Sequence, residues 1–264
     1  MAVKQLEQKA DKNYWDSLWK TNSYQKTKFY ATAFKQYAIM KKHTDKKHPT
    51  LEGGCGLSHW VDIFDSEGYD INGVDYAPKV IGRVKKLKPH LKIELGNVFD
   101  LNFPDEYFGT YYSWGVVEHF EDGPEPIIKE AFRVLKKGGK LLISVPFWNK
   151  KRANHFGEVT SIDKGEFYQY LFSEKEFRTI LEQSGFRFHK SYKLNWIKCY
   201  RQLKRSNSKL KKKTISNSEE SKPKKFLKDP FWKRTIKRII IKIEDFSVLT
   251  SNMGHMILFV VEKK

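Results

Sequence analysis

The sequence has few cysteines and no long apolar run. Only Cys55 and Cys199 are present among 264 residues, which gives neither a disulfide framework nor a cysteine-rich metal cluster. No apolar run reaches the roughly 18 residues of a membrane-spanning helix, and residues 1–7 lack the apolar stretch of a signal peptide. We therefore expect a cytoplasmic protein with reduced thiols, in which Cys55 is a small residue tolerated in a tight turn rather than a nucleophile.

Two phosphate-binding motifs are also missing. Residues 51–58 read Leu-Glu-Gly-Gly-Cys-Gly-Leu-Ser, and His59 stands where a Gly-x-Gly-x-x-Gly motif would place its third glycine. No lysine followed by serine or threonine completes a phosphate loop after these glycines. Both absences argue against a pyrophosphate ligand and leave room for a nucleoside without phosphates.

Positive charge is abundant but unevenly placed. The net charge is +19, and residues 201–242 carry 16 Lys and Arg against three acids, a net of +13 that leaves +6 for the other 222 residues. A case for nucleic-acid binding would therefore rest on that segment and not on the rest of the chain. The hydrophobic content of 39%, with 15% aromatic residues, is enough for the core of one large domain.

An acid follows the glycines at an informative distance. Asp75 lies 19 residues after Gly56 and ends the apolar stretch 71–75. Glycines after a short strand let the backbone turn sharply and approach a ligand that a Cβ would push away. In a Rossmann-like sheet the second strand lies beside the first, so a carboxylate that ends it can accept both hydroxyls of a bound ribose.

Apolar stretches alternate with helical patterns along most of the chain, which predicts an α/β fold with a parallel sheet and helices on both faces. Two N-terminal helices are expected, one over residues 13–20 and one through Phe29, Ala33, Tyr37 and Met40. Further helices are expected to begin at Ser58, Pro78 and Ser173. The expected strands are residues 49–53, 71–75, 92–95, 110–114, 141–145, 186–192 and 255–262.

Residues 51–146 resemble a class I S-adenosylmethionine-dependent methyltransferase, of the small-molecule type that includes quinone and glycan methylating enzymes. The segments that carry the resemblance are 51–56, Gly73-Val74-Asp75-Tyr76, Phe103-Pro104-Asp105-Glu106-Tyr107-Phe108, Val117-Glu118-His119 and 130–141. The resemblance implies a Rossmann-like sheet of seven strands, six parallel and the last one antiparallel, inserted between the fifth and sixth. S-adenosyl-L-methionine is the implied cofactor.

The resemblance also implies which residues bind this cofactor. The backbone of Gly54, Cys55 and Gly56 would flank its methionine part, Glu52 its amino group and Asp75 its ribose. Two positions depart from the family pattern: Ser58 replaces a glycine and is expected to cap the following helix, and Asn97 replaces an aspartate that faces the adenine amine. The full expected set is Glu52, Gly53, Gly54, Cys55, Gly56, Asp75, Tyr76, Asn97, Val98, Ser113, Trp114 and Gly115.

Methyl transfer depends mainly on the alignment of an acceptor, with proton removal where required. His119 is the first candidate for a general base, because the ordinary pKa of histidine suits neutral pH, and His155 is a second candidate. Each of the two histidines also fits a structural role, in which it shapes the pocket without taking part in catalysis. The expected substrate residues are Trp15, Glu158, Tyr168 and Tyr170, each of which also fits ordinary packing. No metal is expected, because Asp100, Asp105 and Glu106 are interpreted as a polar turn.

A basic insertion precedes the last expected strand. Residues 206–225 are polar and low in complexity, which predicts a mobile tether. Residues 231–247 place apolar and basic side chains on opposite faces of a helix, which fits either packing on the domain or peripheral contact with the anionic inner face of a membrane. We divide the chain into a helical cap (1–48), a methyltransferase core (49–200), the basic insertion (201–250) and a final strand (251–264).

Three functions remain open at this stage. The first is methyl transfer to an oxygen, or less readily a nitrogen, of a small molecule, a glycan or a lipid-linked acceptor. The second is an RNA or protein methyltransferase that docks through residues 201–242. Methylation of an exocyclic base amine is disfavoured, because the loop Ser113-Trp114-Gly115-Val116 replaces the Asn/Asp-Pro-Pro-aromatic motif of such enzymes. The third is a silent cofactor-binding partner module. The sequence does not specify an oligomeric state.

Overall fold

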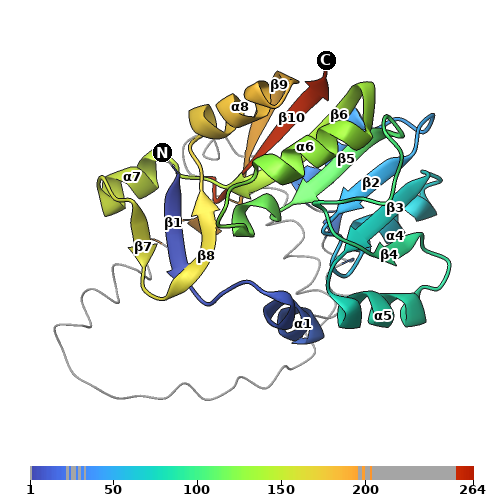
Figure 1. Ribbon diagram of the computed structural model, residues 1–264, viewed down its shortest axis with the longest axis horizontal. Helices are drawn as coiled ribbons and strands as arrows, with labels where there is room; N and C mark the ends of the chain where they lie inside the picture. Colours follow the sequence, from blue (N-terminus) through green and yellow to red (C-terminus); the bar gives the residue numbers. More distant parts are fainter. Residues whose placement is uncertain are drawn as a thin grey trace, which may run out of the picture.

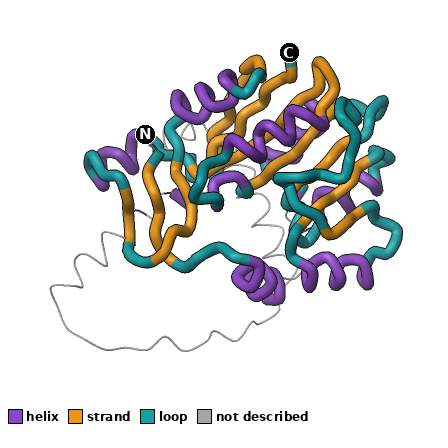
Figure 2. Tube along the Cα trace, viewed as in Figure 1, coloured by secondary structure: helices purple, strands orange, loops and turns teal. Residues whose placement is uncertain are grey.

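The structure is a computed structural model that contains one large and one small β-sheet (Figure 1). It describes residues 2–21, 24, 28, 31, 32, 34–195, 198, 199, 203 and 254–264. Figure 2 shows most of the helices beside the large sheet, while the small sheet stands to one side of it with α7 (Lys150–Phe156) next to it.

The large sheet has seven strands in the order β4-β3-β2-β5-β6-β10-β9. Six strands run in one direction, and β10 is antiparallel to its two neighbours, β6 and β9. This arrangement confirms the expected sheet, including the place of the last strand. The strands are β2 (Thr50–Gly53), β3 (Ile71–Asp75), β4 (Ile93–Leu95), β5 (Phe108–Trp114), β6 (Leu135–Pro146), β9 (Phe186–Leu194) and β10 (Met256–Lys263).

Helices cover both faces of this sheet, as expected. On one face, α3 (Lys35–His43), α4 (His59–Ser66) and α5 (Pro78–Leu87) contribute buried side chains to a cluster with sheet residues such as Tyr112 and Leu258. On the other face, α6 (Glu125–Val134) and α8 (Glu174–Gln183) pack on residues such as Tyr111 and Phe259. Tyr111 and Tyr112 are adjacent in β5, so the alternation of side chains along the strand separates the two layers.

Of the three helix starts expected at Ser58, Pro78 and Ser173, the last two are confirmed and the first is wrong in its capping. Pro78 occupies the first turn of α5, and the Ser173 hydroxyl accepts the Glu176 backbone N–H at the start of α8. The expected Ser58 cap is wrong. Ser58 has φ 53° and its hydroxyl donates to Cys55 Sγ at 3.3 Å, so it extends the glycine turn instead of capping α4.

The small sheet was not expected from the sequence. It has the order β7-β1-β8 and consists of β1 (Val3–Glu7), β7 (Ser161–Asp163) and β8 (Glu166–Leu171). The N-terminal segment therefore starts with a strand, which corrects the interpretation of residues 1–48 as helices alone. Between β1 and α3 lies α1 (Lys12–Thr21), which matches the helix expected over 13–20, and α7 (Lys150–Phe156) precedes β7.

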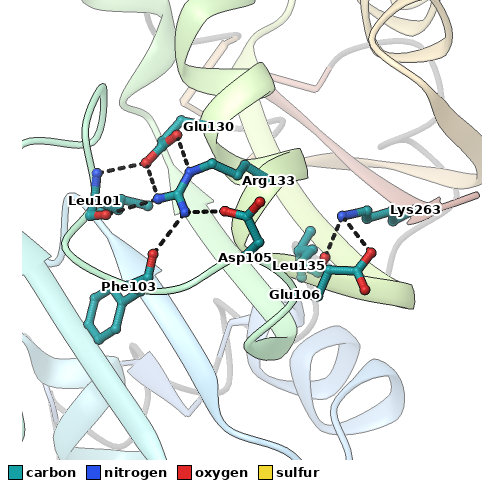
Figure 3. Close-up of polar contacts among 8 residues, drawn as sticks. All are labelled: Leu101, Phe103, Asp105, Glu106, Glu130, Arg133, Leu135 and Lys263. Carbon is teal, nitrogen blue, oxygen red and sulfur yellow. Dashed lines mark hydrogen bonds and ion pairs between the residues drawn. The ribbon is translucent and has the colours of Figure 1, made fainter.

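Several motif residues stabilise the fold away from the cavity described below (Figure 3). The Arg133 guanidinium donates to Asp105 at 2.7 Å, to Glu130 at 2.7 Å and to the carbonyl oxygens of Leu101 and Phe103. These contacts tie the loop before β5 to α6. Asp105 therefore belongs to a structural ion-pair network, which agrees with its interpretation as part of a polar turn.

Parts of the sequence analysis concern residues outside those described. They are Phe29 and Ala33, nearly all of the basic segment 201–242, the tether 206–225 and the amphipathic segment 231–247. Within the described ranges, none of the helices combines the length and the apolar character needed to cross a bilayer.

Candidate active site

A cavity opens where β2, β3 and β5 end, at the carboxyl edge of the large sheet. The space within it amounts to about 680 Å³, which includes open solvent at its mouth. The helix α1 and the short helix η1 (Val117–His119) also contribute to its wall. The lining residues are Ala10, Trp15, Trp19, Gly54, Asp75, Tyr76, Gly96, Asn97, Val98, Trp114, Gly115, Val116, His119 and Phe120.

The glycine turn and Asp75 are held together by hydrogen bonds. Asp75 Oδ2 accepts the Gly56 N–H at 2.8 Å, and Oδ1 accepts the Ala77 N–H at 2.9 Å. Burial raises the pKa of Asp75, and these backbone N–H groups partly oppose the rise. Gly54 has φ 75°, and a Cβ there would lie 2.4 Å from Val116, so the turn and the opposite loop approach closely only because this residue is glycine.

Glu52 and Cys55 lie beneath this turn. The Glu52 side chain is buried, its Oε2 has no hydrogen-bond partner, and its pKa is raised well above the ordinary range, mainly by burial and also by Asp75. Burial likewise raises the pKa of the Cys55 thiol, which supports a packing role rather than a nucleophilic one.

Several polar atoms near these strand ends have no hydrogen-bond partner among the described residues, and of their residues only Trp114 lines the cavity. Besides Glu52 Oε2, they include Ser113 Oγ, Trp114 Nε1 and Glu118 Oε2, all fully buried. Buried polar groups normally have partners, and an unpaired one costs about 1–3 kcal/mol. Carboxyl oxygens and an indole donor at one edge of the sheet fit a nucleoside that carries an amino acid, because such a ligand supplies hydroxyl and ammonium donors together with a carboxylate acceptor.

Asn97 and Val98 form the wall beside Asp75, as the sequence predicted for an adenine site. The Asn97 side-chain oxygen already accepts the Phe99 N–H at 3.1 Å. A carbonyl oxygen has two lone pairs, so one remains for an adenine amine. The neighbouring Gly96 brings the backbone close to β3, where an added Cβ would lie 2.9 Å from Val74.

His119 lines the cavity from η1 and is held on several sides. Its Nδ1 lies 2.8 Å from the carbonyl oxygen of Tyr168, which can only accept, so Nδ1 carries the proton and Nε2 the lone pair. Its ring also packs edge-on against Trp15, at 4.9 Å between centroids. Burial lowers the pKa of His119 to about 4, so the imidazole is neutral at pH 7 and a weaker base than the sequence analysis assumed.

Helix α1 covers the opening of the glycine turn. A Cβ on Gly56 would lie 3.1 Å from the Trp19 indole, and Trp15 Nε1 donates to the Ala10 carbonyl oxygen at 3.2 Å. The Tyr14 hydroxyl donates a hydrogen bond to the Tyr168 hydroxyl at 3.1 Å, which connects α1 to β8 of the small sheet. The cavity is therefore bounded by elements that lie more than 100 residues apart in the sequence.

The structure brings together only part of the predicted site. Of the expected cofactor residues, Gly54, Asp75, Tyr76, Asn97, Val98, Trp114 and Gly115 line the cavity. Glu52, Gly53, Cys55, Gly56 and Ser113 lie at the same strand ends without lining it.

Among the expected catalytic and substrate residues, Trp15 and His119 line the cavity, but His155, Glu158, Tyr168 and Tyr170 do not. Glu158 is exposed, and His155 lies in the last turn of α7. The Tyr170 hydroxyl donates to the carbonyl oxygen of Glu121 at 2.9 Å. Tyr168 contributes through its backbone, which holds His119.

Sequence reasoning missed five lining residues: Ala10, Trp19, Gly96, Val116 and Phe120. Trp19 lies in the helix expected over residues 13–20, and its position four residues after Trp15 is the signal that both indoles share one helix face. The other four have small or apolar side chains that carry no local mark of ligand binding.

Comparison with known proteins agrees with this geometry. A family model described as a methyltransferase domain matches residues 51–143. The chain is 28% identical over 136 residues to a probable S-adenosylmethionine-dependent methyltransferase of Mycolicibacterium smegmatis, covering 52% of this chain and 51% of that protein. It is 32% identical over 112 residues to the chloroplastic 2-methyl-6-phytyl-1,4-hydroquinone methyltransferase of Arabidopsis thaliana, covering 40% of this chain and 33% of that protein.

The fold has solved counterparts. The crystal structure of a SAM-dependent methyltransferase from Archaeoglobus fulgidus superposes with a TM-score of 0.56 at 14% identity, covering 95% of this chain and 99% of that one. The alignments cover about half of the first relative identified by sequence and a third of the second. The matched segment contains the glycine turn, Asp75 and His119, and the sheet has the order and direction of strands expected for the fold. Residues 51–143 belong to the methyltransferase-domain family, and the sheet has the fold of the class I S-adenosylmethionine-dependent methyltransferases.

Proposed function

We propose that this protein transfers the methyl group of S-adenosylmethionine to an oxygen, or less readily a nitrogen, of a small-molecule, glycan or lipid-linked acceptor. The observation that carries the proposal is His119, a neutral imidazole on the cavity wall whose protonation is fixed by the Tyr168 carbonyl. The name of the hydroquinone methyltransferase relative supports a small aromatic acceptor. The aromatic lining of Trp15, Trp19 and Phe120 suits a largely apolar acceptor.

The cofactor would bind across the strand ends. Asp75 would accept the ribose hydroxyls, Asn97 and Val98 would face the adenine, and the turn at Gly54 would lie beside the methionine part. Glu52 and Trp114 carry the unpaired acceptor and donor that suit the amino and carboxylate groups. When bound, S-adenosylmethionine supplies an activated methyl group.

The protein's part in the reaction is to position the acceptor and accept its proton. Nε2 of His119 carries the lone pair, and the Trp15 ring restrains the imidazole. An acceptor hydroxyl that donates to Nε2 would lose its proton as its oxygen takes the methyl group, so the imidazole becomes cationic. Because burial opposes this cation, His119 favours acceptors whose hydroxyl is itself acidic, such as phenols.

Labelled cofactor incubated with fractionated cell extract tests the proposal and identifies the acceptor. His119→Asn keeps a donor toward the Tyr168 carbonyl but removes the base. We expect it to bind S-adenosylhomocysteine like the unaltered protein while methyl transfer falls about 10²–10⁴-fold. The exposed His90→Asn is the matched control and should transfer normally. An unchanged rate in His119→Asn would remove His119 from the mechanism.

Other outcomes separate the remaining functions. Label in RNA or protein fractions, with a salt-sensitive complex, would favour the macromolecular methyltransferase. Binding of S-adenosylhomocysteine without transfer to any fraction would favour a silent partner module. Failure of well-folded protein to bind it at all, with no effect of Asp75→Ala, would overturn the proposal.

A further inference from the structure

Helix α1 lies outside residues 51–143, the segment that carries the family match, yet it places Trp15 on the cavity wall beside His119. The His119 imidazole packs edge-on against two rings, Trp15 at 4.9 Å and Tyr168 at 5.0 Å between centroids. Tyr168 belongs to a strand of the small sheet, whereas Trp15 belongs to a helix of ten residues, which is too short to be stable without contacts to the rest of the protein. The position of the Trp15 ring therefore depends on what holds α1.

The Ala10 carbonyl oxygen, just before α1, is one point at which Trp15 is held. It accepts the Trp15 indole N–H at 3.2 Å and the Tyr76 hydroxyl at 3.3 Å, and a carbonyl oxygen has two lone pairs for two such donors. Ala10, Trp15 and Tyr76 all line the cavity, whereas Lys9 and Asp11 on either side of Ala10 are exposed. The Tyr76 hydroxyl thus attaches the segment before α1 to the core.

Tyr76 directly follows Asp75, the carboxylate that would hold the ribose of the cofactor. Its ring forms part of the cavity wall, and a phenylalanine ring would form the same wall, so this position alone does not require a hydroxyl. The two hydrogen bonds at Ala10 and the edge-on contact of Trp15 with His119 form a continuous path from the ribose end of the cavity to the imidazole.

We propose that Tyr76 is a positioning residue for His119. Its hydroxyl holds the Ala10 carbonyl, the carbonyl holds the Trp15 indole, and the indole ring keeps the imidazole at the angle that it presents to the acceptor. Without the hydroxyl, Trp15 keeps its own bond to Ala10, but the segment that carries both residues is attached less firmly to the core. The inference rests on the proposed function, in which His119 is the base.

Tyr76→Phe tests this role, because it removes the hydroxyl and keeps the ring. Diethyl pyrocarbonate acylates an unprotonated imidazole nitrogen, so the rate of His119 modification, assigned by mass spectrometry of peptides, reports how well the imidazole is held without any need for turnover. We expect modification about two- to tenfold faster in Tyr76→Phe, the change that loss of one hydrogen bond allows. The exposed His90 and the buried His255 should react at unchanged rates. Tyr107→Phe, at an exposed tyrosine that does not line the cavity, is the matched control.

Methyl transfer gives a second readout. Tyr76→Phe should lower kcat about tenfold and leave KM and the affinity for S-adenosylhomocysteine unchanged, because both ligands still bind while the base is misaligned. Trp15→Phe loses the indole N–H that binds the same carbonyl oxygen. Tyr76→Phe should therefore have a smaller effect when added to Trp15→Phe than when made alone, since both changes act through one set of contacts.

Equal modification of His119 in Tyr76→Phe and in the unaltered protein would overturn the inference. Faster modification of His119 and His255 together would also overturn it, because that result reports loosening of the whole domain. Weaker binding of S-adenosylhomocysteine with an unchanged modification rate would make Tyr76 an ordinary cofactor contact. Absence of methyl transfer by the unaltered protein would instead overturn the proposed function, and the modification rates would still decide whether Tyr76 holds the imidazole.

Discussion

Burial sets the protonation of the titratable side chains around the cavity. It raises the pKa of Glu118 to about 8 and lowers that of His119 to about 4, although the two residues are adjacent in η1. At neutral pH the carboxyl is mostly protonated and the imidazole is uncharged, so neither places a full charge beside the acceptor.

The glycine turn and Asp75 were predictable because their geometry is local. A turn off a strand needs glycine at positive φ, and the acid follows at the length of one helix and one strand. His119 was predictable as a cavity residue but not in its chemistry. Its fixed proton arises from the carbonyl of Tyr168, 49 residues away, and its lowered pKa arises from burial in the assembled cavity; no local pattern indicates either.

His255 gives a test of burial through stability. It is 9% exposed, its Nδ1 accepts from Arg152 at 2.9 Å, and burial with the nearby cations Lys198 and Arg152 lowers its pKa from 6.5 to about 2. Between these two values the unfolded chain binds a proton that the folded protein does not. The free energy of unfolding should therefore fall as the pH decreases below about 6.5.

We expect His255 to contribute about 2 kcal/mol to the loss of stability between pH 7 and pH 5. His255→Asn keeps an acceptor for Arg152 but cannot be protonated, so urea unfolding at both pH values should show this part of the loss removed. The exposed His90→Asn should retain the full loss. An equal pH dependence in His255→Asn and the unaltered protein would contradict the assignment.

At the scale of elements, the large sheet was predictable and the small one was not. The strand expected over residues 71–75 coincides with β3, because the end of one helix and the proline that begins the next fix both limits of the apolar run. β1 is a five-residue segment with alternating polar residues, and its partners begin at Ser161. Pairing over such a sequence distance depends on the assembled fold, which local propensity does not encode.

The strand expected over residues 141–145 starts later than β6, which begins at Leu135. Residues 136–139 lie inside the strand as an irregularity, between the pairs Phe108↔Leu135 and Thr110↔Lys140. Gly138 supplies the positive φ of 74° that this irregularity requires.

The start of α8 gives a prediction at this scale. The Ser173 hydroxyl accepts the Glu176 N–H at 3.3 Å, and α8 packs on the sheet through the buried residues Phe177 and Leu181. Ser173→Ala should lower the free energy of unfolding by about 1 kcal/mol, measured by urea denaturation. Thr179→Ala, at an exposed position within the same helix, should change it by less than about 0.5 kcal/mol. Equal effects would show that the cap contributes nothing specific.

At the scale of the whole molecule, the basic insertion connects two strand ends that lie side by side. Met256 at the start of β10 pairs with Leu194 at the end of β9, and the His255 N–H donates to the Leu194 carbonyl oxygen at 2.7 Å. Met256 also lies 3.9 Å from where a Cβ would stand on Gly115, which lines the cavity. The chain therefore leaves and rejoins the sheet at the edge that carries the proposed active site.

This geometry makes the insertion removable. Deleting residues 206–245 leaves enough chain to join adjacent strand ends, and shortening a loop lowers its closure cost by about 0.6 kcal/mol for each halving. We expect the deleted protein to fold and to bind S-adenosylhomocysteine like the full chain. If residues 231–247 recruit the enzyme to a lipid-linked acceptor, the full chain should bind anionic vesicles and the deleted form should not, since each basic residue near such a surface contributes about 1 kcal/mol.

Sedimentation with vesicles of phosphatidylserine and phosphatidylcholine, compared with phosphatidylcholine alone, separates the alternatives. Binding of the full chain to both would exclude the electrostatic part of the attraction. Unfolding of the deleted form would instead show that the apolar side of 231–247 packs on the domain, because the adjacent ends of β9 and β10 need no insertion to hold them together. Recruitment and packing therefore predict opposite results for the same deletion, and cofactor binding by the deleted form decides between them.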